Sequence, residues 1–197
     1  MNPCGDSLMV EQQTFPFVSG GSIPTSPLQF KVIEIDKFTA RNLNEKWHSR
    51  LPVYETGFCL NSLVSYGLLY NNTLYGIAIW TNPVAPALPQ QGWLELRRMA
   101  LSPEVPKNTA SRMLSVMRRL IERKFPEVEK LISYQDTEVH RGTIYKAAGW
   151  VIGATHKGGS WNRPNSTNQN GTPRTRPDHN QSIGPKVRWE FRLRGKL

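Results

Sequence analysis

Apolar residues recur along this chain at two spacings, which predict two kinds of element. Residues 113, 114, 117, 120 and 121 are apolar at helical spacing, and Pro126 marks the end of that helix. Near the C-terminus, Val187, Trp189, Phe191 and Leu193 alternate with charged residues, which predicts a strand with one apolar face. The chain therefore mixes helices and strands.

Other segments complete this order of elements. Thr39 can cap a helix that carries Leu43 and Trp47 on one side and ends before Pro52. The last helix ends in the pattern Tyr-x-x-x-Gly-Trp at 145–150, and residues 71–73 (Asn-Asn-Thr) predict a hairpin turn. Strands are expected at 30–35, 64–70, 74–80, 94–101, 130–134 and 150–155, with a proline-containing loop at 82–92.

The ends of the chain differ in composition from its middle. Residues 1–28 are rich in Gly, Ser, Pro and Gln and predict a flexible arm, followed by one domain over 29–197. Residues 158–185 are poor in apolar residues and predict a mobile basic insertion, and long segments of this kind are often functional.

Charge narrows the class of partner. The net charge is +10, and residues 154–197 hold nine Lys and Arg against two acidic residues, or +7. Such a basic excess favours a polyanion partner, although basic tails also improve solubility. The absence of an apolar run near ~20 residues and of a secretory signal predicts no membrane segment. Two cysteines, Cys4 and Cys59, do not make a disulfide framework.

Several strings, in order, resemble a known family. These are Lys-Trp-His-Ser-Arg-Leu-Pro (46–52), Glu-Leu-Arg-Arg (95–98), Pro-Lys-Asn-Thr-Ala-Ser (106–111), Ser-Tyr-Gln-Asp (133–136) and His-Arg-Gly-Thr-Ile-Tyr (140–145). Together they resemble the phage-encoded Mom family, over roughly residues 37 to 155. The wider run 94–150 resembles the cofactor-binding half of GNAT acyltransferases. The resemblance implies an α/β (α+β) fold with a GNAT-like mixed, mostly antiparallel sheet flanked by helices.

The same resemblance implies a function and a partner. Mom-type proteins attach a carbamoylmethyl group to adenine N6 in DNA, which protects phage DNA from restriction. The expected partner is then double-stranded DNA in the cytoplasm of the bacterial host. Basic residues late in the chain would contact its phosphates, and the candidates are Lys157, Arg163, Arg174, Arg176, Arg192 and Arg194.

Three residues are candidates for catalysis. His48 could act as a general base, or simply bond a carbonyl at the end of its helix. Asp136 could accept the amine proton, orient His48 or bind a metal, and equally could be a loop carboxylate or the N-cap of the last helix. Tyr145 matches the GNAT tyrosine that protonates the leaving group, and a packed core aromatic is the alternative.

A second group is expected to bind substrate or cofactor. Arg97 and Arg98 should alternate across their strand, and Glu95 on the face of Arg97 predicts an ion pair. The stretch 103–111 contains no glycine, which argues against acetyl-CoA because a backbone usually needs glycine to approach a phosphate closely. The remaining candidates are Lys107, Asn108, Thr109, Ser111 and Tyr134.

Other assignments stay open at this point. Iron held by His48, Asp136 and His140 fits the ligand chemistry but no recognised spacing. Arg112, Arg119 and Arg123 share a helix face, either as a phosphate-binding stripe or as a solvated surface. The alternative functions are a CoA-dependent N-acetyltransferase acting on a small amine or protein, and a non-catalytic DNA-binding protein.

Overall fold

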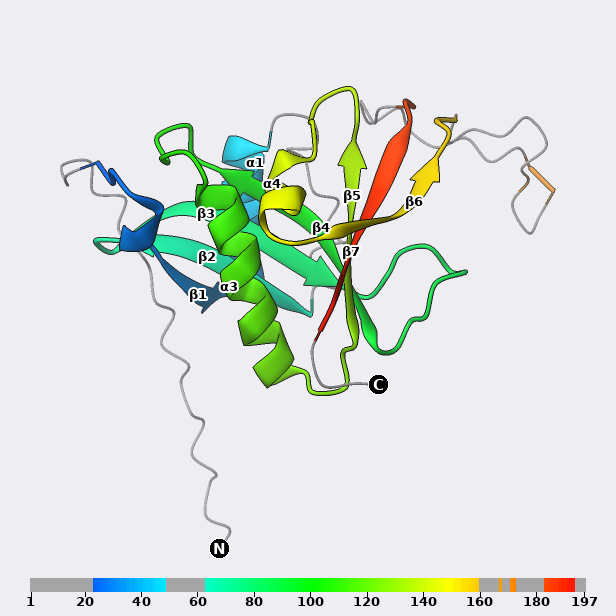
Figure 1. Ribbon diagram of the computed structural model, residues 1–197, viewed down its shortest axis with the longest axis horizontal. Helices are drawn as coiled ribbons and strands as arrows, with labels where there is room; N and C mark the ends of the chain where they lie inside the picture. The colour runs from blue at the N-terminus through cyan, green and yellow to red at the C-terminus, as the bar shows by residue number, and fades with distance from the viewer. Residues whose placement is uncertain (1–22, 49–62, 160–166, 168–170, 173–182, 194–197) are drawn as a thin grey trace, which may run out of the picture.

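One sheet organises the molecule, with helices on both of its faces (Figure 1). The computed structural model describes residues 23–48, 63–159, 167, 171–172 and 183–193. Seven strands lie in the order β1-β2-β3-β4-β5-β7-β6, and every neighbouring pair is antiparallel except β4 and β5. The prediction of a mixed, mostly antiparallel sheet flanked by helices is confirmed.

The strands follow the predicted alternation closely. Their bounds are β1 Lys31–Ile35, β2 Val64–Tyr70, β3 Thr73–Thr81, β4 Trp93–Leu101, β5 Lys130–Asp136, β6 Val151–His156 and β7 Lys186–Arg192. Between β2 and β3, Asn71 and Asn72 both have positive φ, of 45° and 59°. That conformation is the one a two-residue hairpin turn requires, and asparagine tolerates it better than most residues.

The helices begin and end where capping chemistry places them. They are α1 Lys37–Trp47, α3 Thr109–Lys124 and the short α4 Thr143–Ala147, with a 3-10 turn η1 at Pro27–Gln29. The predicted cap of α1 at Thr39 is wrong. Asp36 is the N-cap, and its carboxylate accepts hydrogen bonds from the amides of Phe38 and Thr39, each at 2.9 Å. Two amide donors bind a carboxylate more strongly than a hydroxyl could, so the aspartate begins the helix.

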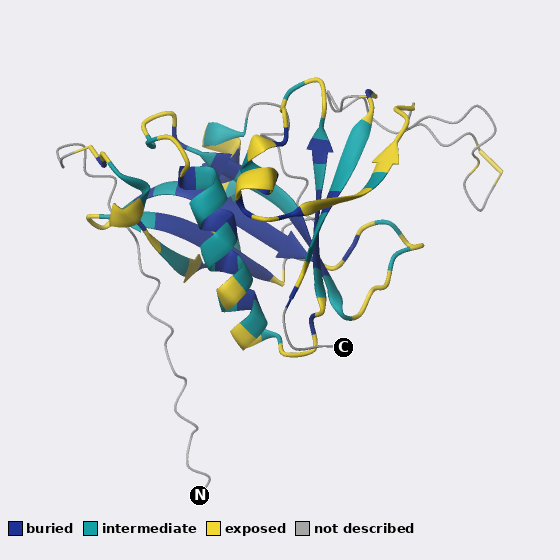
Figure 2. Ribbon diagram, in the orientation of Figure 1, coloured by how far each residue is buried: buried dark blue, intermediate teal, exposed yellow. Residues whose placement is uncertain are grey.

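Two hydrophobic clusters fix the helices to opposite faces of the sheet. On one face, α3 and α4 cover the larger cluster, which includes Trp80, Met117, Leu131 and Trp189. On the other face, α1 packs its Ala40 and Leu43 against a smaller cluster on β1 to β4. Figure 2 shows the strands behind α3 in the colour of buried residues and β6, at the edge of the sheet, as exposed. No helix in the described ranges is long and apolar enough to cross a membrane.

Candidate active site at the divergence of strands β4 and β5

Strands β4 and β5, the one parallel pair among the described strands, separate part of the way along their length. Pairing between β4 and β5 runs from Trp93 with Lys130 to Leu96 with Ser133 and then stops. Both strands continue, β4 to Leu101 and β5 to Asp136. The predicted site residues on these strands therefore lie around a gap at the carboxyl ends of parallel strands, a usual place for ligands in α/β proteins.

A bulge in β4 places both arginines on one face of the sheet. Ile79 pairs with Arg98 and the next residue of β3 pairs with Leu96, so Arg97 is the extra residue. Arg98 shares the α1 face with Ile79, and Arg97 bonds Glu95 on that same face. The prediction that the two arginines alternate is wrong, because the bulge interrupts the period-two pattern.

Glu95 connects this pair to the loop before β4. Its side chain is only 2 % exposed, and its Oε1 accepts a hydrogen bond from Arg97 Nη1 at 2.8 Å. Its other oxygen accepts from the amide of Val84 at 2.9 Å. The predicted ion pair is confirmed, and the same carboxylate holds the 82–92 loop beside the arginines.

His48, at the C-cap of α1, lies within electrostatic range of Arg98. Its backbone amide donates to the carbonyl of Asn44 at 2.8 Å, as expected for a residue that ends a helix. Burial is the largest cause that lowers the pKa of its imidazole to about 4, and electrostatic interactions with Arg98 and His140 contribute to the same shift. The structure thus brings His48, Arg98 and His140 together, and His48 is neutral at pH 7.

Asp136, the last residue of β5, organises the turn that carries His140. Its Oδ1 accepts from the amide of Glu138 at 3.0 Å, and its carbonyl accepts from the amide of His140 at 2.9 Å. Asp136 is therefore a turn carboxylate at the edge of the site. It is not the N-cap of α4, since Gly142 occupies that position.

Gln135, which was not among the predicted site residues, holds this turn through the hydrogen bonds of its side chain. Its buried amide accepts from Trp189 Nε1 at 2.7 Å and donates to the carbonyl of His140. Gly142 lies directly against it with φ 70°, and a Cβ there would come within 2.5 Å of Gln135 Oε1. Gln135 stands within the matched string at 133–136, which was the available signal.

Tyr145 reaches the end of the β4–β5 pairing from the opposite face. Its hydroxyl is 2.9 Å from Ser133 Oγ, which also donates to the carbonyl of Leu96 at 3.4 Å. Its ring stacks on Trp189 with 5.4 Å between centroids. Burial raises the pKa of the phenol, although the hydrogen bond with Ser133 opposes the shift, so the group stays protonated. A protonated phenol can donate a proton, as its predicted role requires.

The predicted cofactor loop begins α3 with an unusual backbone. Asn108 is the N-cap at φ 68°, but its side chain makes no capping hydrogen bond. The hydroxyls of Thr109 and Ser111 donate to the carbonyls of Pro106 and Asn108. Lys107 beside them is exposed. These hydroxyls therefore satisfy carbonyls of the loop itself.

A hollow of about 390 Å³ lies at this helix start. Asn108, Ser111 and Arg112 line one side, and Pro27 and Leu28 of the η1 turn line the other. Arg112 Nε donates to the carbonyl of Pro27 at 3.0 Å, which attaches the turn to α3. In the structure, then, Arg112 contacts the chain's own N-terminal segment.

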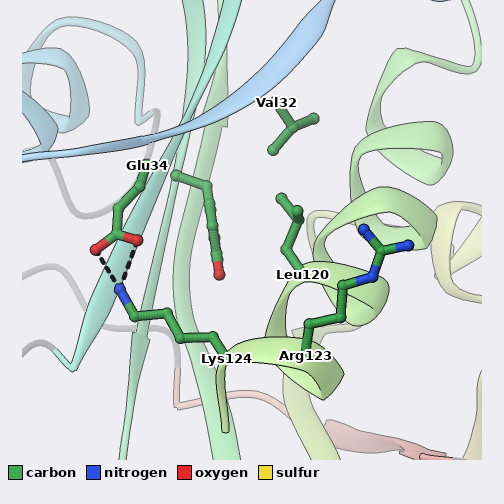
Figure 3. A pocket seen from close by; sticks show the side chains of 6 residues that line it. Val32, Glu34, Leu120, Arg123 and Lys124 are labelled. Atoms are coloured by element: carbon green, nitrogen blue, oxygen red, sulfur yellow. Dashed lines mark hydrogen bonds and ion pairs between the residues drawn. The ribbon is translucent and has the colours of Figure 1, made fainter.

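A second hollow, of about 280 Å³, lies far from these residues, between β1, β2 and the end of α3. Figure 3 shows the ion pair between Glu34 and Lys124 at its rim, where Nζ and Oε1 are 2.5 Å apart. Arg123 lies on the same stretch of α3 (Figure 3). Of the residues that line this hollow, Arg123 was named from the sequence, as part of a possible phosphate-binding stripe on its helix.

The remaining predicted residues divide between described and undescribed parts of the chain. Lys157 and Arg192 are exposed, whereas Arg163, Arg174, Arg176 and Arg194 lie outside the described residues, as does most of the predicted arm and insertion. Among described residues, no three His, Cys, Asp or Glu side chains form a group that could hold a metal ion. Iron at His48, Asp136 and His140 stays a prediction.

Acetyltransferases are among the solved structures that this chain resembles in fold. The ribosomal-protein-S18-alanine N-acetyltransferase of Escherichia coli is 12% identical with a TM-score of 0.58, over 85% of this chain and 96% of that one. A GNAT family acetyltransferase from Elizabethkingia anophelis, solved with acetyl-CoA bound, is 14% identical with a TM-score of 0.55, over 84% and 99% of the two chains. At these identities the likeness establishes a GNAT-like fold.

Sequence relatives identify the family. Methylcarbamoylase mom of Escherichia phage Mu is 28% identical over 138 residues, which are 66% of this chain and 55% of that protein. The chain thus spans about half the length of this relative. The model of the Mom protein family matches residues 29–186, which include every predicted site residue that the structure describes except Arg192. The chain belongs to the Mom protein family.

Proposed function

We propose that this protein is a transferase that modifies DNA, adding a carbamoylmethyl-type group to adenine N6 and so protecting phage DNA from restriction. The observation that carries the proposal is the family match over residues 29–186. The polar cluster around His48 and Arg98 supports it, because it lies where β4 and β5 diverge in a GNAT-like fold.

The proposed reaction requires a group that activates the adenine amine as a nucleophile. The lone pair of an exocyclic amine is delocalised into the adenine ring, so N6 is a weak nucleophile. As its bond to the donor carbon forms, the bond from that carbon to the leaving group breaks, and the leaving group takes the electron pair. N6 must lose a proton in the same step, and the base must first be held out of the helical stack.

The described residues can take these parts. His48 and Asp136 are the candidate proton acceptors, since at pH 7 the lowered pKa of His48 leaves its imidazole neutral. Tyr145 stays protonated and can supply a proton to the leaving group. Arg97 and Arg98, brought to one face by the bulge, can hold an anionic part of the donor or a phosphate.

Nucleoside mass spectrometry of plasmid DNA co-expressed with this protein tests the activity. The parent should yield a modified adenine, and His48→Ala or Asp136→Asn should yield none. Glu138→Gln, which removes another carboxylate from the same turn, is the matched control and should keep the modification. Only unmodified nucleosides and ordinary methylated bases, from cells making folded protein, would overturn the proposal and favour the non-catalytic DNA-binding alternative.

DNA affinity separates chemistry from binding. The His48 and Asp136 variants should bind DNA almost as the parent does, because these groups are assigned to the base and not to phosphates. Neutralising Arg174, Arg176, Arg192 and Arg194 together should weaken binding. Each lost phosphate contact should also flatten the log–log salt dependence by about 0.9 for duplex DNA. An unchanged salt slope would remove these arginines from the interface.

A CoA-dependent N-acetyltransferase remains the second candidate, and the fold shared with acetyltransferases favours it. The loop before α3 argues against it, since it lacks glycine and the hydroxyls of Thr109 and Ser111 donate to its own carbonyls. Acetyl-CoA should therefore bind weakly or not at all. Low-micromolar affinity in a calorimetric titration would show that the cofactor prediction is wrong.

A further inference from the structure

One half of the α1 face of the sheet is not covered by that helix. α1 packs mainly on β2, β3 and β4, and on this face β5, β7 and β6 extend past it (Figure 1). The strand registers place a set of long side chains on this half, which no helix in the described part of the chain covers. We call this set the basic–aromatic strip, and it consists of Trp93, Lys130, Tyr134, His156, Arg188 and Arg192.

One end of the strip presents two cations over an aromatic ring. Lys130 Nζ lies 4.1 Å from the centroid of the Trp93 ring, and the guanidinium carbon of Arg188 lies 6.0 Å from it. Glu190 holds both cations, since one carboxylate oxygen lies 2.8 Å from Lys130 Nζ and the other 2.8 Å from Arg188 Nη2. Because Gly153 on β6 has no side chain, the carboxylate can lie flat against that strand.

The other end of the strip presents two rings beside the candidate site. The rings of Tyr134 and His156 have centroids 5.8 Å apart and are tilted by 48°. Tyr134 is two residues before Asp136 and on the same face of β5, so this ring pair borders the gap between β4 and β5. His156 is exposed and Tyr134 is partly so, which leaves room for a planar group to stack.

We infer that the basic–aromatic strip binds the nucleic-acid strand that carries the target base. Phosphates would contact Lys130, Arg188 and Arg192, and a base of that strand would stack on Tyr134 and His156. The three cations Lys130, Arg188 and Arg192 against the carboxylate of Glu190 give the strip a positive charge, and interleaved aromatic and basic side chains are the usual composition of surfaces that bind exposed bases. That the strand is DNA rests on the proposed function.

Stacking is tested by the affinity of the full chain for a fluorescent DNA duplex with one unpaired adenine, measured by anisotropy. Tyr134→Ala should weaken binding by about ten-fold or more, since a base–aromatic stack is lost, whereas Tyr134→Phe should stay within about two-fold. Equal affinity of the parent and the alanine variant would overturn the stacking role. Equal loss in both variants would assign the effect to the hydroxyl and overturn it too.

The charge of the strip is tested in the same assay, first by removing its carboxylate and then by removing two of its cations. Glu190→Gln releases Lys130 and Arg188 from their carboxylate, so it should tighten binding and steepen the salt dependence, even though it removes two ion pairs. Glu104→Gln, an exposed carboxylate in the loop after β4, is the control and should change affinity less. A loss of thermal stability in Glu190→Gln without tighter binding would show that these pairs serve only the fold.

Arg188→Gln with Arg192→Gln should weaken binding and flatten the log–log salt slope by about 0.9 for each lost contact. The charge-matched control is Arg119→Gln with Arg123→Gln, which removes two exposed cations of α3 on the opposite side of the sheet. If both double variants weakened DNA binding equally, the effect would come from net charge alone, and the proposed role of the strip would be wrong. Competition by polyglutamate as strong as that of unlabelled DNA would also overturn it, since an acidic protein partner would then fit the surface as well.

The binding measurements and the modification assay test the strip and the proposed function independently. Modified adenine in plasmid DNA together with unchanged binding by the strip variants would leave the proposed function standing and remove the strip. Weakened binding by the strip variants together with unmodified plasmid DNA would leave the strip standing and remove the activity.

Discussion

On the α3 side, β4 and β5 present Leu94, Leu96 and Leu131 to a closed apolar cluster. On the α1 side, the same two strands present Glu95, Arg97 and Tyr134 around a gap. The closed side packs the strands against α3 and α4, and an unpaired charge placed there would be costly. The polar side can carry chemistry because α1 covers only part of it and the parallel pair separates beside it. Substitutions on the two sides should therefore fail in different ways.

The largest difference in stability should be between the alanine variants of two tryptophans on opposite faces of the sheet. Trp80 is fully buried, and its indole Nε1 lies 3.4 Å from Met117 Sδ. Trp80→Ala should lower the free energy of unfolding by about 3–5 kcal/mol, as cavities in cores usually do. Trp93→Ala should cost about 1 kcal/mol, because that ring is partly exposed and contacts cations. Urea unfolding measures both, and similar losses would contradict the distinction between the faces.

The next contrast concerns protonation of His48 on the polar side. Its pKa is about 4 in the folded chain against 6.5 ordinarily, so between these values the unfolded chain binds the proton more tightly. Stability should therefore fall as the pH drops from 6.5 toward 4, by up to about 3 kcal/mol from this group. His48→Gln should lose that part of the dependence, since its amide does not titrate. Parallel stability curves for parent and variant would contradict the assignment.

A smaller effect should separate packing from backbone strain at the turn that carries His140. Gly142 and Gly149 both have positive φ, of 70° and 78°. A Cβ at Gly142 would lie 2.5 Å from Gln135 Oε1 and 2.7 Å from Trp189 Cζ2, whereas at Gly149 the nearest atom is 3.8 Å away. Gly149→Ala should cost about 1 kcal/mol from strain, and Gly142→Ala about 1–3 kcal/mol. Thermal unfolding gives both values. An equal loss of stability would show that the Gln135 side chain moves aside without an energetic penalty.

The smallest effect is expected at the hollow of Figure 3. Lys124 and Glu34 are 41% and 53% exposed, so water and salt screen their ion pair. Lys124→Gln should change stability by less than about 1 kcal/mol and leave the modification of plasmid DNA unchanged. A clear loss of modification in this variant would place function at a site outside the polar side.

Sequence reasoning predicted most of the fold because local pattern decides most of it. β2 was predicted with both ends correct, and the alternating residues of β7 bury Trp189 while Arg188 and Arg192 share the other face. Thr39 was wrongly chosen over Asp36 as a cap. Both side chains suit helix starts, and only the structure shows which one meets the free amides.

The candidate site was predicted residue by residue but not as an arrangement. Family strings supplied His48, Asp136 and Tyr145, yet no spacing could show that His48 lies within reach of the charges of Arg98 and His140. The strip was missed for a similar reason. Its members are separated by up to about a hundred residues in the chain, and only the order β4-β5-β7-β6 brings them to one surface.

The extra residue in β4 has a consequence for any mutational scan of this strand. Before the bulge, odd-numbered positions such as 93 and 95 face α1, and after it even-numbered positions such as 98 and 100 do. A library that mutates every second position from 93 to 101 would therefore change sides halfway along and mix binding defects with folding defects. Deleting Arg97, the extra residue, would bring the two halves into phase, because Leu96 and Arg98 already pair with consecutive residues of β3 and would keep their faces.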